Sequence, residues 1–386
     1  MGEQHFSLFL VIFGAAVVPF LARRLRIPSA ALEIVYGALL FNLLLKGRPD
    51  WFDLLREIGF VYLMFIAGME LDLGAIQRSG KTFWYVLVSL LSFTVTPLIF
   101  VAFGQPFFLG VAVAMISAGI VIPVLKELEL IRTPLGRDIV GVALTGELLS
   151  ILALTLIDAY EKHGLTWYAG LELLKLTLLF MLALFVLKLL YLLAWWNPER
   201  VEKVMESEDP VEEGIRAVVT VAFSGGLLAA AAGAEPILGS FLAGVVFGHV
   251  FKSKGRFEEK INALGFGFLI PFFFIGVGSQ LDLSLLTQPE TLLMALFLTA
   301  MVLVSNLFPL LLARPLRLSL REAAAMSILL SAPLSMIVVA GTLGERMGVI
   351  SSETAGALIL TALLASILYP TLFRPLGRKI LPTPQV

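Results

Sequence analysis

The chain has 386 residues, of which 59% are hydrophobic and only 15% are charged. A soluble globular domain is about half apolar and about a quarter charged, so this composition indicates an integral membrane protein. The net charge of −1 gives no argument for nucleic-acid binding, and the absence of cysteine excludes disulfides, thiolate metal sites and cysteine nucleophiles. We therefore expect one all-α membrane domain that needs no cofactor.

A helix needs about 20 apolar residues to cross a bilayer, and this length predicts about thirteen spans. In chain order they cover 6–22, 31–46, 51–71, 82–104, 106–128, 136–159, 167–196, 214–233, 235–251, 258–281, 291–313, 320–344 and 351–373. The first segment has the length of a signal peptide, but its arginines follow the apolar run instead of preceding it. We interpret it as a first membrane helix.

Lysine and arginine are concentrated in alternate loops between the predicted spans. These loops and the tail carry Arg23, Arg24, Arg26, Arg78, Lys81, Arg132, Arg137, Arg200, Lys203, Lys252, Lys254, Arg256, Arg314, Arg317, Arg374, Arg378 and Lys379. The remaining loops carry only Lys46, Arg48, Lys162 and Arg346. Because cytoplasmic loops hold the excess of basic residues, we expect a multi-pass protein of the cell (inner) membrane. Its N-terminus is expected outside and its C-terminus in the cytoplasm.

Two predicted spans contain helix breakers near their middle. The stretch ISAGIVIPVL contains Ser117, Gly119 and Pro123, and LLSAPLSMIV contains Ser331 and Pro333. Each stretch lies in the central span of a triplet, and the two triplets run in opposite directions through the membrane. A single interruption is also typical of a kinked structural helix. Paired interruptions in inverted repeats, however, indicate the binding site of a secondary transporter.

Glu147 is a single carboxylate in the apolar stretch VALTGELLSIL, near the centre of the span 136–159. A charged residue at this depth costs a few kcal/mol, so it indicates a functional site. Since no lysine, arginine or histidine lies near mid-depth of another predicted span, a proton or a bound monovalent cation must neutralise it. Competition between the two predicts one-for-one, electroneutral exchange of Na⁺ or K⁺ for H⁺. The alternative is a protonated structural glutamate that bonds a neighbouring helix.

Glu147 is thus the predicted metal ligand and proton site, and other oxygens are expected to complete the shell around the cation. The main candidates are Ser117, Ser150 and Ser331. Further helpers are Gly119, Pro123, Asn306, Thr96, Pro333 and Asp158. Asp158 lies eleven residues after Glu147, near the same helical face, where it would attract cations or be an ordinary interfacial charge.

Three stretches, FIAGMELDL (65–73), PILGSFLAGVVFG (236–248) and PFFFIGVGSQLDL (271–283), resemble the monovalent cation:proton antiporter-2 family. That family includes NapA-type sodium/proton and Kef-type potassium/proton antiporters. The resemblance implies a NapA/NhaA-like antiporter fold with two crossing discontinuous helices, a homodimer and elevator-type alternating access. It also implies a division of the chain into parts. The dimer-interface part covers about 1–75 and 212–283, the ion-translocating core about 82–160 and 291–376, and a linking helix and cytoplasmic loop 161–211.

The chain also departs from that family's pattern. Members usually carry Asp-Asp, Asn-Asp or Gln-Asp where this chain has Gly146 and Glu147. Electrogenic members have a lysine where this chain offers Asn306, and an arginine and a glutamate often stand where it has Leu334 and Met336. The missing second acid and lysine agree with electroneutral exchange but leave the identity of the cation open.

Three other functions remain as alternatives. The first is a sodium-coupled or proton-coupled carrier of an organic solute with the same architecture, which calls for basic groups in the core that the sequence hardly offers. The second is a channel, although paired broken helices fit alternating access better. The third is a membrane enzyme, which the sequence does not support because it has no paired acids, no Ser/His arrangement and no metal-ligand cluster.

Overall fold

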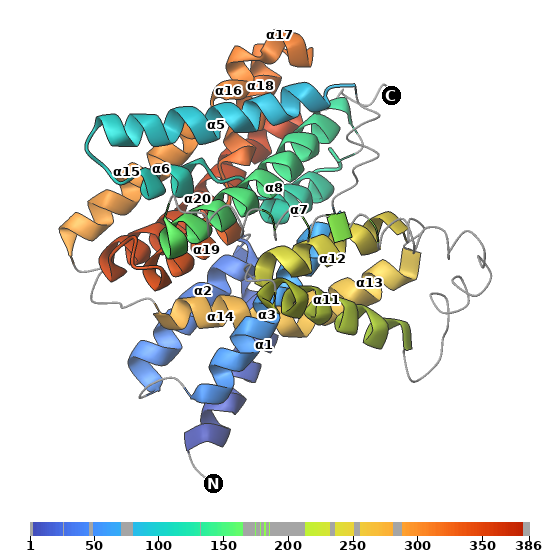
Figure 1. The fold of residues 1–386 in the computed structure, drawn as a ribbon, viewed down its shortest axis with the longest axis vertical. Helices are drawn as coiled ribbons and strands as arrows, with labels where there is room; N and C mark the ends of the chain where they lie inside the picture. Colours follow the sequence, from blue (N-terminus) through green and yellow to red (C-terminus); the bar gives the residue numbers. More distant parts are fainter. Residues whose placement is uncertain are drawn as a thin grey trace. The chain divides into compact units, whose positions relative to one another are not determined.

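The computed structural model describes residues 3–25, 27–45, 49–70, 80–131, 133–164, 213–231, 236–250, 255–280 and 288–380, with the single positions 174, 178, 181, 182 and 185. Every regular element within these residues is helical (Figure 1). Most of the predicted span 167–196 lies outside them, as do the ends of two of the family-like stretches. The chain divides into two compact units, and we describe each by itself.

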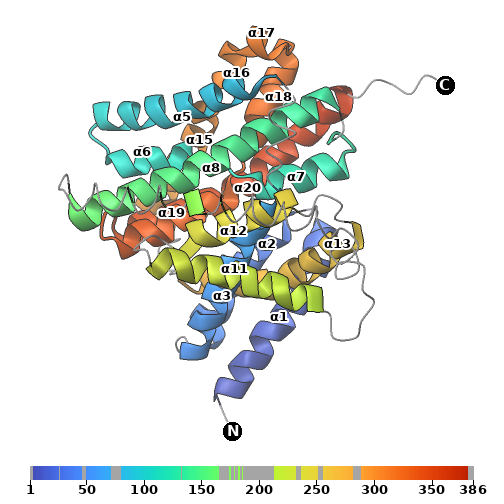
Figure 2. The same ribbon diagram turned by 45° about the vertical axis from the view of Figure 1, so that its right-hand side comes forward.

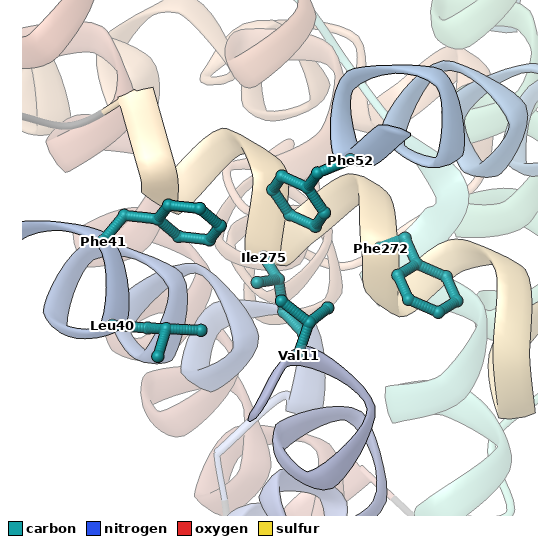
Figure 3. Close-up of a cluster of buried hydrophobic side chains, with 6 residues drawn as sticks. All are labelled: Val11, Leu40, Phe41, Phe52, Phe272 and Ile275. Atoms are coloured by element: carbon teal, nitrogen blue, oxygen red, sulfur yellow. The ribbon is translucent and has the colours of Figure 1, made fainter. Parts of the chain in front are cut away.

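Unit 1 comprises Met1–Leu21, Glu33–Gly74 and Thr155–Ser279. Its helices are α1 (Glu3–Leu25), α2 (Ser29–Leu39) with the π-turn η1 (Leu40–Leu44), α3 (Asp50–Glu70), α11 (Glu213–Ala231), α12 (Pro236–Val250), α13 (Gly255–Leu264), η2 (Gly265–Leu269) and α14 (Ile270–Gln280). Figure 3 shows part of its core, formed by Val11, Leu40, Phe41, Phe52, Phe272 and Ile275. The apolar faces of α1, α2, α3 and α14 meet there.

Backbone contact between α3 and α12 holds a second part of unit 1 together. A Cβ added at Gly68 would lie 2.0 Å from the carbonyl oxygen of Phe241, and one at Gly244 would lie 2.0 Å from that of Phe65. Small residues that let two helices approach this closely are typical of helix pairs in membranes. The two glycines therefore set the spacing of α3 and α12.

Unit 2 comprises Ala22–Leu32, Ala75–Leu154 and Gln280–Val386. Its helices are α5 (Thr82–Ala102), α6 (Phe107–Ala114), α7 (Ala118–Glu127), most of α8 (Pro134–His163), α15 (Pro289–Ser305), α16 (Phe308–Leu311), α17 (Ala313–Leu316), α18 (Leu320–Leu330), α19 (Leu334–Arg346) and α20 (Ser352–Ile380). Figure 2 shows that α6 and α7 are separate helices, as are α18 and α19. Unit 2 contains Glu147.

The apolar helices confirm an all-α membrane protein. Among the described residues, seven helices are long and apolar enough to cross a membrane, and α18 with α19 makes an eighth candidate span, bent by 41° at its break. The seven are His5–Leu25, Thr82–Ala102, Pro134–Glu161, Gly214–Ala231, Phe257–Ser279, Pro289–Leu311 and Ser352–Gly377. Three shorter apolar helices cover Ser29–Leu44, Phe107–Ile122 and Gly239–Gly248. The predicted count of thirteen spans is not confirmed.

The two predicted interruptions are present in unit 2. α6 ends at Ala114, Met115 has an extended backbone, and α7 begins at Ala118. Pro123 lies inside α7 and not at the break itself. α18 ends at Leu330, and α19 begins after Pro333. Proline has no N–H and disfavours a helical conformation in the residue before it, so Pro333 favours a break here. Pro97 lies inside the continuous helix α5, so a proline alone does not dictate a break.

A third interruption was not predicted. The sequence favours one continuous helix over 291–313, but α15 ends at Ser305 and α16 begins at Phe308. Pro309 has no N–H to donate to the carbonyl of Ser305, four residues before it. That carbonyl accepts a hydrogen bond from Ser92 Oγ of α5 instead, at 2.6 Å. The carbonyl that loses its helical partner at the end of α15 therefore gains a hydrogen bond from a side chain of another helix.

A buried polar network joins the beginnings of α5 and α8. Asp138 accepts hydrogen bonds from Lys81 Nζ at 2.7 Å and from Tyr85 Oη at 2.6 Å. The ring of Tyr85 also lies against α8, because a Cβ added at Gly141 would come within 2.5 Å of it. The network fixes the position of α8, and therefore of Glu147, relative to α5.

Candidate functional site

Glu147 is buried in unit 2, on α8, with only 2% of its surface exposed. Its carboxylate faces the break between α6 and α7. Oε1 accepts a hydrogen bond from Ser117 Oγ at 3.1 Å, and Oε2 lies 3.4 Å from the backbone N–H of Ala118. Ala118 is the first residue of α7, so the carboxylate lies at the positive end of that helix. The predicted acid and the predicted break thus meet in the structure.

Ser117 connects three elements at this point. Its hydroxyl oxygen caps α7 by accepting from the backbone N–H of Gly119, and it lies 2.7 Å from Ser335 Oγ in the first turn of α19. Ser117 has a single hydroxyl proton, and donation to Glu147 uses it. While Glu147 is ionised, Ser335 must therefore donate to Ser117. The arrangement of Glu147, Ser117 and Ser335 is called the Glu147 site below.

The Glu147 site is buried but lies beside an exposed position. Ser117 and Ser335 are both buried, whereas Gly119, in the first turn of α7, is exposed. A Cβ added at Gly119 would lie 3.6 Å from both hydroxyl oxygens, which is ordinary van der Waals distance. The hydroxyl pair is therefore separated from the surface by little more than the width of this glycine.

Ser150 supports the break without touching the carboxylate in any contact that the structure gives. Its hydroxyl oxygen accepts from the N–H of Ile116 at 3.1 Å, and its single proton lies between the carbonyl of Gly146 at 2.8 Å and that of Ile116 at 3.1 Å. Gly146, one turn earlier on α8, makes room for the same residue, since a Cβ there would lie 2.7 Å from Ile116 Cβ. Gly146 and Ser150 together seat Ile116 against α8, which places Ser117 opposite Glu147.

The structure assigns Ser331 and Asn306 to a different cluster. Ser331 Oγ donates to the carbonyl of Ser327 at 2.7 Å and lies 3.5 Å from the carbonyl of Val302. Asn306 Nδ2 donates to the same Val302 carbonyl at 2.9 Å and lies 3.3 Å from Ser305 Oγ. These residues, Ser305, Asn306, Ser327 and Ser331 with the Val302 carbonyl, are called the second cluster below.

The remaining predicted helpers lie apart from the carboxylate. Thr96 is buried on α5, and no described hydrogen bond joins it to Glu147. Asp158 is buried on α8, in the part of that helix that belongs to unit 1. Pro333 caps the beginning of α19. Pro123 lies within α7, and its missing N–H leaves the Gly119 carbonyl without a helical partner.

Two residues of the site were missed from the sequence. Ser335 stands two residues after Pro333 in the stretch LLSAPLSMIV and was not among the candidates, although a hydroxyl in the first turn after a break is well placed to meet a site at that break. Ile116 carries no polar group, so nothing in its type indicates its role. Gly146 was interpreted only as a position without a liganding side chain, whereas the structure uses its lack of a side chain for packing.

The whole chain resembles one known family. Residues 10–379 match the family described as sodium/hydrogen exchanger, transmembrane. Among solved structures, the fold is similar to that of the sodium proton antiporter MjNhaP1 from Methanocaldococcus jannaschii, with a TM-score of 0.70 over 99% of this chain and all of that one. The sequence identity between the two is 16%, so this likeness concerns the fold.

Curated relatives extend the comparison. An Na⁺/H⁺ antiporter of Enterococcus hirae is 25% identical over 97% of this chain and 98% of its own length. The protein YjbQ of Bacillus subtilis is 30% identical over 97% of this chain, but the matched part spans only 63% of that relative. The chain therefore corresponds to nearly the whole length of the Enterococcus hirae antiporter, but to less than two thirds of the length of YjbQ.

Proposed function

Because the chain belongs to the sodium/hydrogen exchanger family, we propose that it is a secondary active antiporter that exchanges a monovalent cation, Na⁺ or K⁺, for H⁺. One observation carries this proposal. The side chain of Glu147 on α8 is buried against the first turn of α7 and the hydroxyl pair Ser117–Ser335. Such a carboxylate binds either a proton or a hard cation, and it binds only one of them at a time.

The geometry balances two opposing effects on the charge of Glu147. Burial in a low-dielectric interior disfavours the ionised carboxylate. The hydroxyl of Ser117, the N–H of Ala118 and the positive end of α7 favour it. Where these effects offset each other, the negative charge of Glu147 is neutralised by either a proton or a cation, depending on which is available. This is the requirement for competitive exchange at one carboxylate.

Cation binding is proposed to rearrange the two hydroxyl groups. A bound cation takes one carboxylate lone pair of Glu147 and the oxygens of Ser117 and Ser335, so both hydroxyl protons turn away from the site. Proton binding restores the hydrogen-bonded chain, now with Glu147 as a donor. In both loaded states the site carries no net charge, so we propose one-for-one, electroneutral exchange.

The larger-scale features are proposed on the same basis. Unit 2 carries the Glu147 site, and we propose that it is the part that moves, by an elevator-type mechanism, while unit 1 forms the interface of a homodimer. The chain is proposed to lie in the cell membrane with its N-terminus outside and its C-terminus in the cytoplasm. A carrier of an organic solute is not favoured by membership of this family.

Reconstitution in liposomes that contain a pH dye tests the function. An inward gradient of Na⁺ or K⁺ is expected to raise the internal pH, at a rate that does not change when the membrane potential is clamped at either sign. A rate that depends on voltage would contradict electroneutral exchange. An internal pH that responds to an organic solute but to no cation would contradict antiport and support the carrier.

Replacement of Ser117 with alanine is expected to lower the apparent cation affinity about tenfold, because one oxygen ligand is lost, worth about 1.4 kcal/mol. The loss of the cap of α7 is expected to reduce the free energy of unfolding by about 1 kcal/mol. Transport at varied cation concentration and thermal unfolding measure the two effects. Ser117→Thr should restore the affinity. The control is Ser366→Ala, which removes a buried hydroxyl whose one hydrogen bond among the described residues goes to the Leu363 carbonyl of its own helix.

A further inference from the structure

The second cluster has no role in the proposed exchange, yet it contains two buried polar atoms without partners. Asn306 Oδ1 and Ser327 Oγ have no hydrogen-bond partner in the part of the chain that the structure describes. Asn306 is 0% exposed and Ser327 is 1% exposed. An unsatisfied buried polar group costs about 1–3 kcal/mol, and native proteins rarely keep two together without a ligand for them.

Asn306 belongs to a group of side chains around one carbonyl oxygen, and Ser327 is one turn from another member of that group, Ser331. Asn306 reaches the Val302 carbonyl through its Nδ2, and Ser331 lies 3.5 Å from the same oxygen. Ser327 is one turn before Ser331 on α18, so the two side chains are on the same face of that helix. The unpaired oxygens of Asn306 and Ser327 are therefore on the two helices that meet at Val302.

The orientation of the Asn306 amide is determined by its neighbours. The Val302 carbonyl can only accept a hydrogen bond, so the NH₂ group must face it. This leaves Oδ1 as a pure acceptor with both lone pairs unused. No charged side chain takes part in the hydrogen bonds described for the second cluster. The cluster thus offers oxygen lone pairs, without a carboxylate and without a competing cationic group in these bonds.

Three helices end at this cluster. Asn306 caps the C-terminus of α15, and Ser331 caps the C-terminus of α18. Ser305 Oγ lies 2.8 Å from the carbonyl of Val302 and 3.1 Å from that of Val113, in the last turn of α6, and its single proton serves one of the two. The aligned peptide dipoles of a helix give its C-terminal end about half a negative charge. The Glu147 carboxylate lies at a helix N-terminus, whereas the second cluster gathers the negative ends of three helices.

We propose that the second cluster is a binding site for a dehydrated monovalent cation, with Asn306 Oδ1 and Ser327 Oγ as side-chain ligands. Neutral oxygens at helix C-termini and interrupted helices are the ligands that membrane transporters use for such ions. A divalent cation is disfavoured because it requires carboxylates. The site is distinct from the Glu147 site, and its existence does not depend on the role of Glu147.

Thermal unfolding of the full chain in detergent tests the second site in a Glu147→Gln background, where the exchange site is disabled. Na⁺ and Rb⁺ are titrated against choline at constant ionic strength. We expect a saturable rise in Tm in Glu147→Gln, since a ligand that binds only the folded state stabilises it. We expect no such rise in Glu147→Gln/Asn306→Leu. Thr361→Val in the same background removes a buried hydroxyl that bonds carbonyls of α15 and α20, and it should keep the rise.

Anomalous diffraction from crystals of Glu147→Gln grown with Rb⁺ provides a second measurement that does not depend on the folding of the Asn306 variant. A Rb⁺ peak within coordination distance of Asn306 Oδ1 supports the site. A water molecule without anomalous signal at that position, or a Tm rise that survives Asn306→Leu, overturns it. Exchange by wild-type liposomes tests the proposed antiport separately, so failure of one proposal leaves the other standing.

Discussion

Glu147→Gln is expected to reduce cation-driven proton movement to the background of protein-free liposomes. The amide neither binds a proton near neutral pH nor supplies the negative charge that attracts a cation, so both loaded states are lost. Ser117 and Ala118 donate toward two carboxylate oxygens, and glutamine offers one acceptor. The free energy of unfolding is expected to fall by only about 1 kcal/mol, so the variant should fold.

The matched control for this prediction is Glu33→Gln. Glu33 is a second buried glutamate, 3% exposed, but it lies on α2 in unit 1. If exchange required only a buried carboxyl group at any position, both variants would lose exchange. The proposed site predicts that only Glu147→Gln does. Glu147→Asp keeps the charge but moves it away from Ser117. Exchange is therefore expected to be slower than in the wild type and to require a higher cation concentration. Full exchange by Glu147→Gln would remove this residue from the mechanism.

Gly146→Ala is expected to impair both folding and exchange, although it adds only one methyl group. Its Cβ would lie 2.7–2.9 Å from three side-chain atoms of Ile116. Ile116 is fully buried, and its backbone N–H donates to Ser150 Oγ, so its displacement would cost a hydrogen bond as well as packing. Overpacking of this kind costs about 1–3 kcal/mol. Displacement of Ile116 also moves Ser117, the next residue, away from Glu147.

Thermal unfolding and liposome transport measure these two effects, with Gly119→Ala as the stability control. Gly119 belongs to the same site, but its added Cβ meets atoms no closer than 3.6 Å, so no loss of stability is expected. The double variant Gly146→Ala/Ile116→Ala should lose less stability than the sum of the single variants, because the smaller side chain accommodates the methyl group. Strictly additive losses would show that the contact with Ile116 does not explain the effect.

The sequence alone was sufficient for the class of the protein, and it singled out Glu147 as the candidate exchange site. Apolar segments and the lack of polar blocks specify membrane helices because each backbone polar group must be satisfied within the bilayer. Glu147 is visible for the same reason, since a carboxylate is costly in such a segment. The missing N–H of proline favours the break near Pro333 without knowledge of tertiary contacts, although Pro97 and Pro370 lie inside continuous helices.

Packing between segments distant in sequence decided which groups each serine hydroxyl contacts. Ser331 and Ser335 are four residues apart and would share one face of a continuous helix. The break between them ends that periodicity, so Ser331 joins the second cluster while Ser335 reaches Ser117, 218 residues away in sequence. Pro309 was visible in the sequence, but only the structure showed that the break before it is satisfied by Ser92 of another helix.

The role of Gly146 shows the same limit. In the sequence, a glycine beside the candidate acid Glu147 is only the absence of a ligand. In the structure it is the position at which α8 approaches Ile116 too closely for any side chain. Composition and spacing report the chemistry of single residues and the regularity of single helices. The rotation and spacing of helices relative to one another depend on contacts between distant segments, and these brought Glu147, Ser117 and Ser335 into one site.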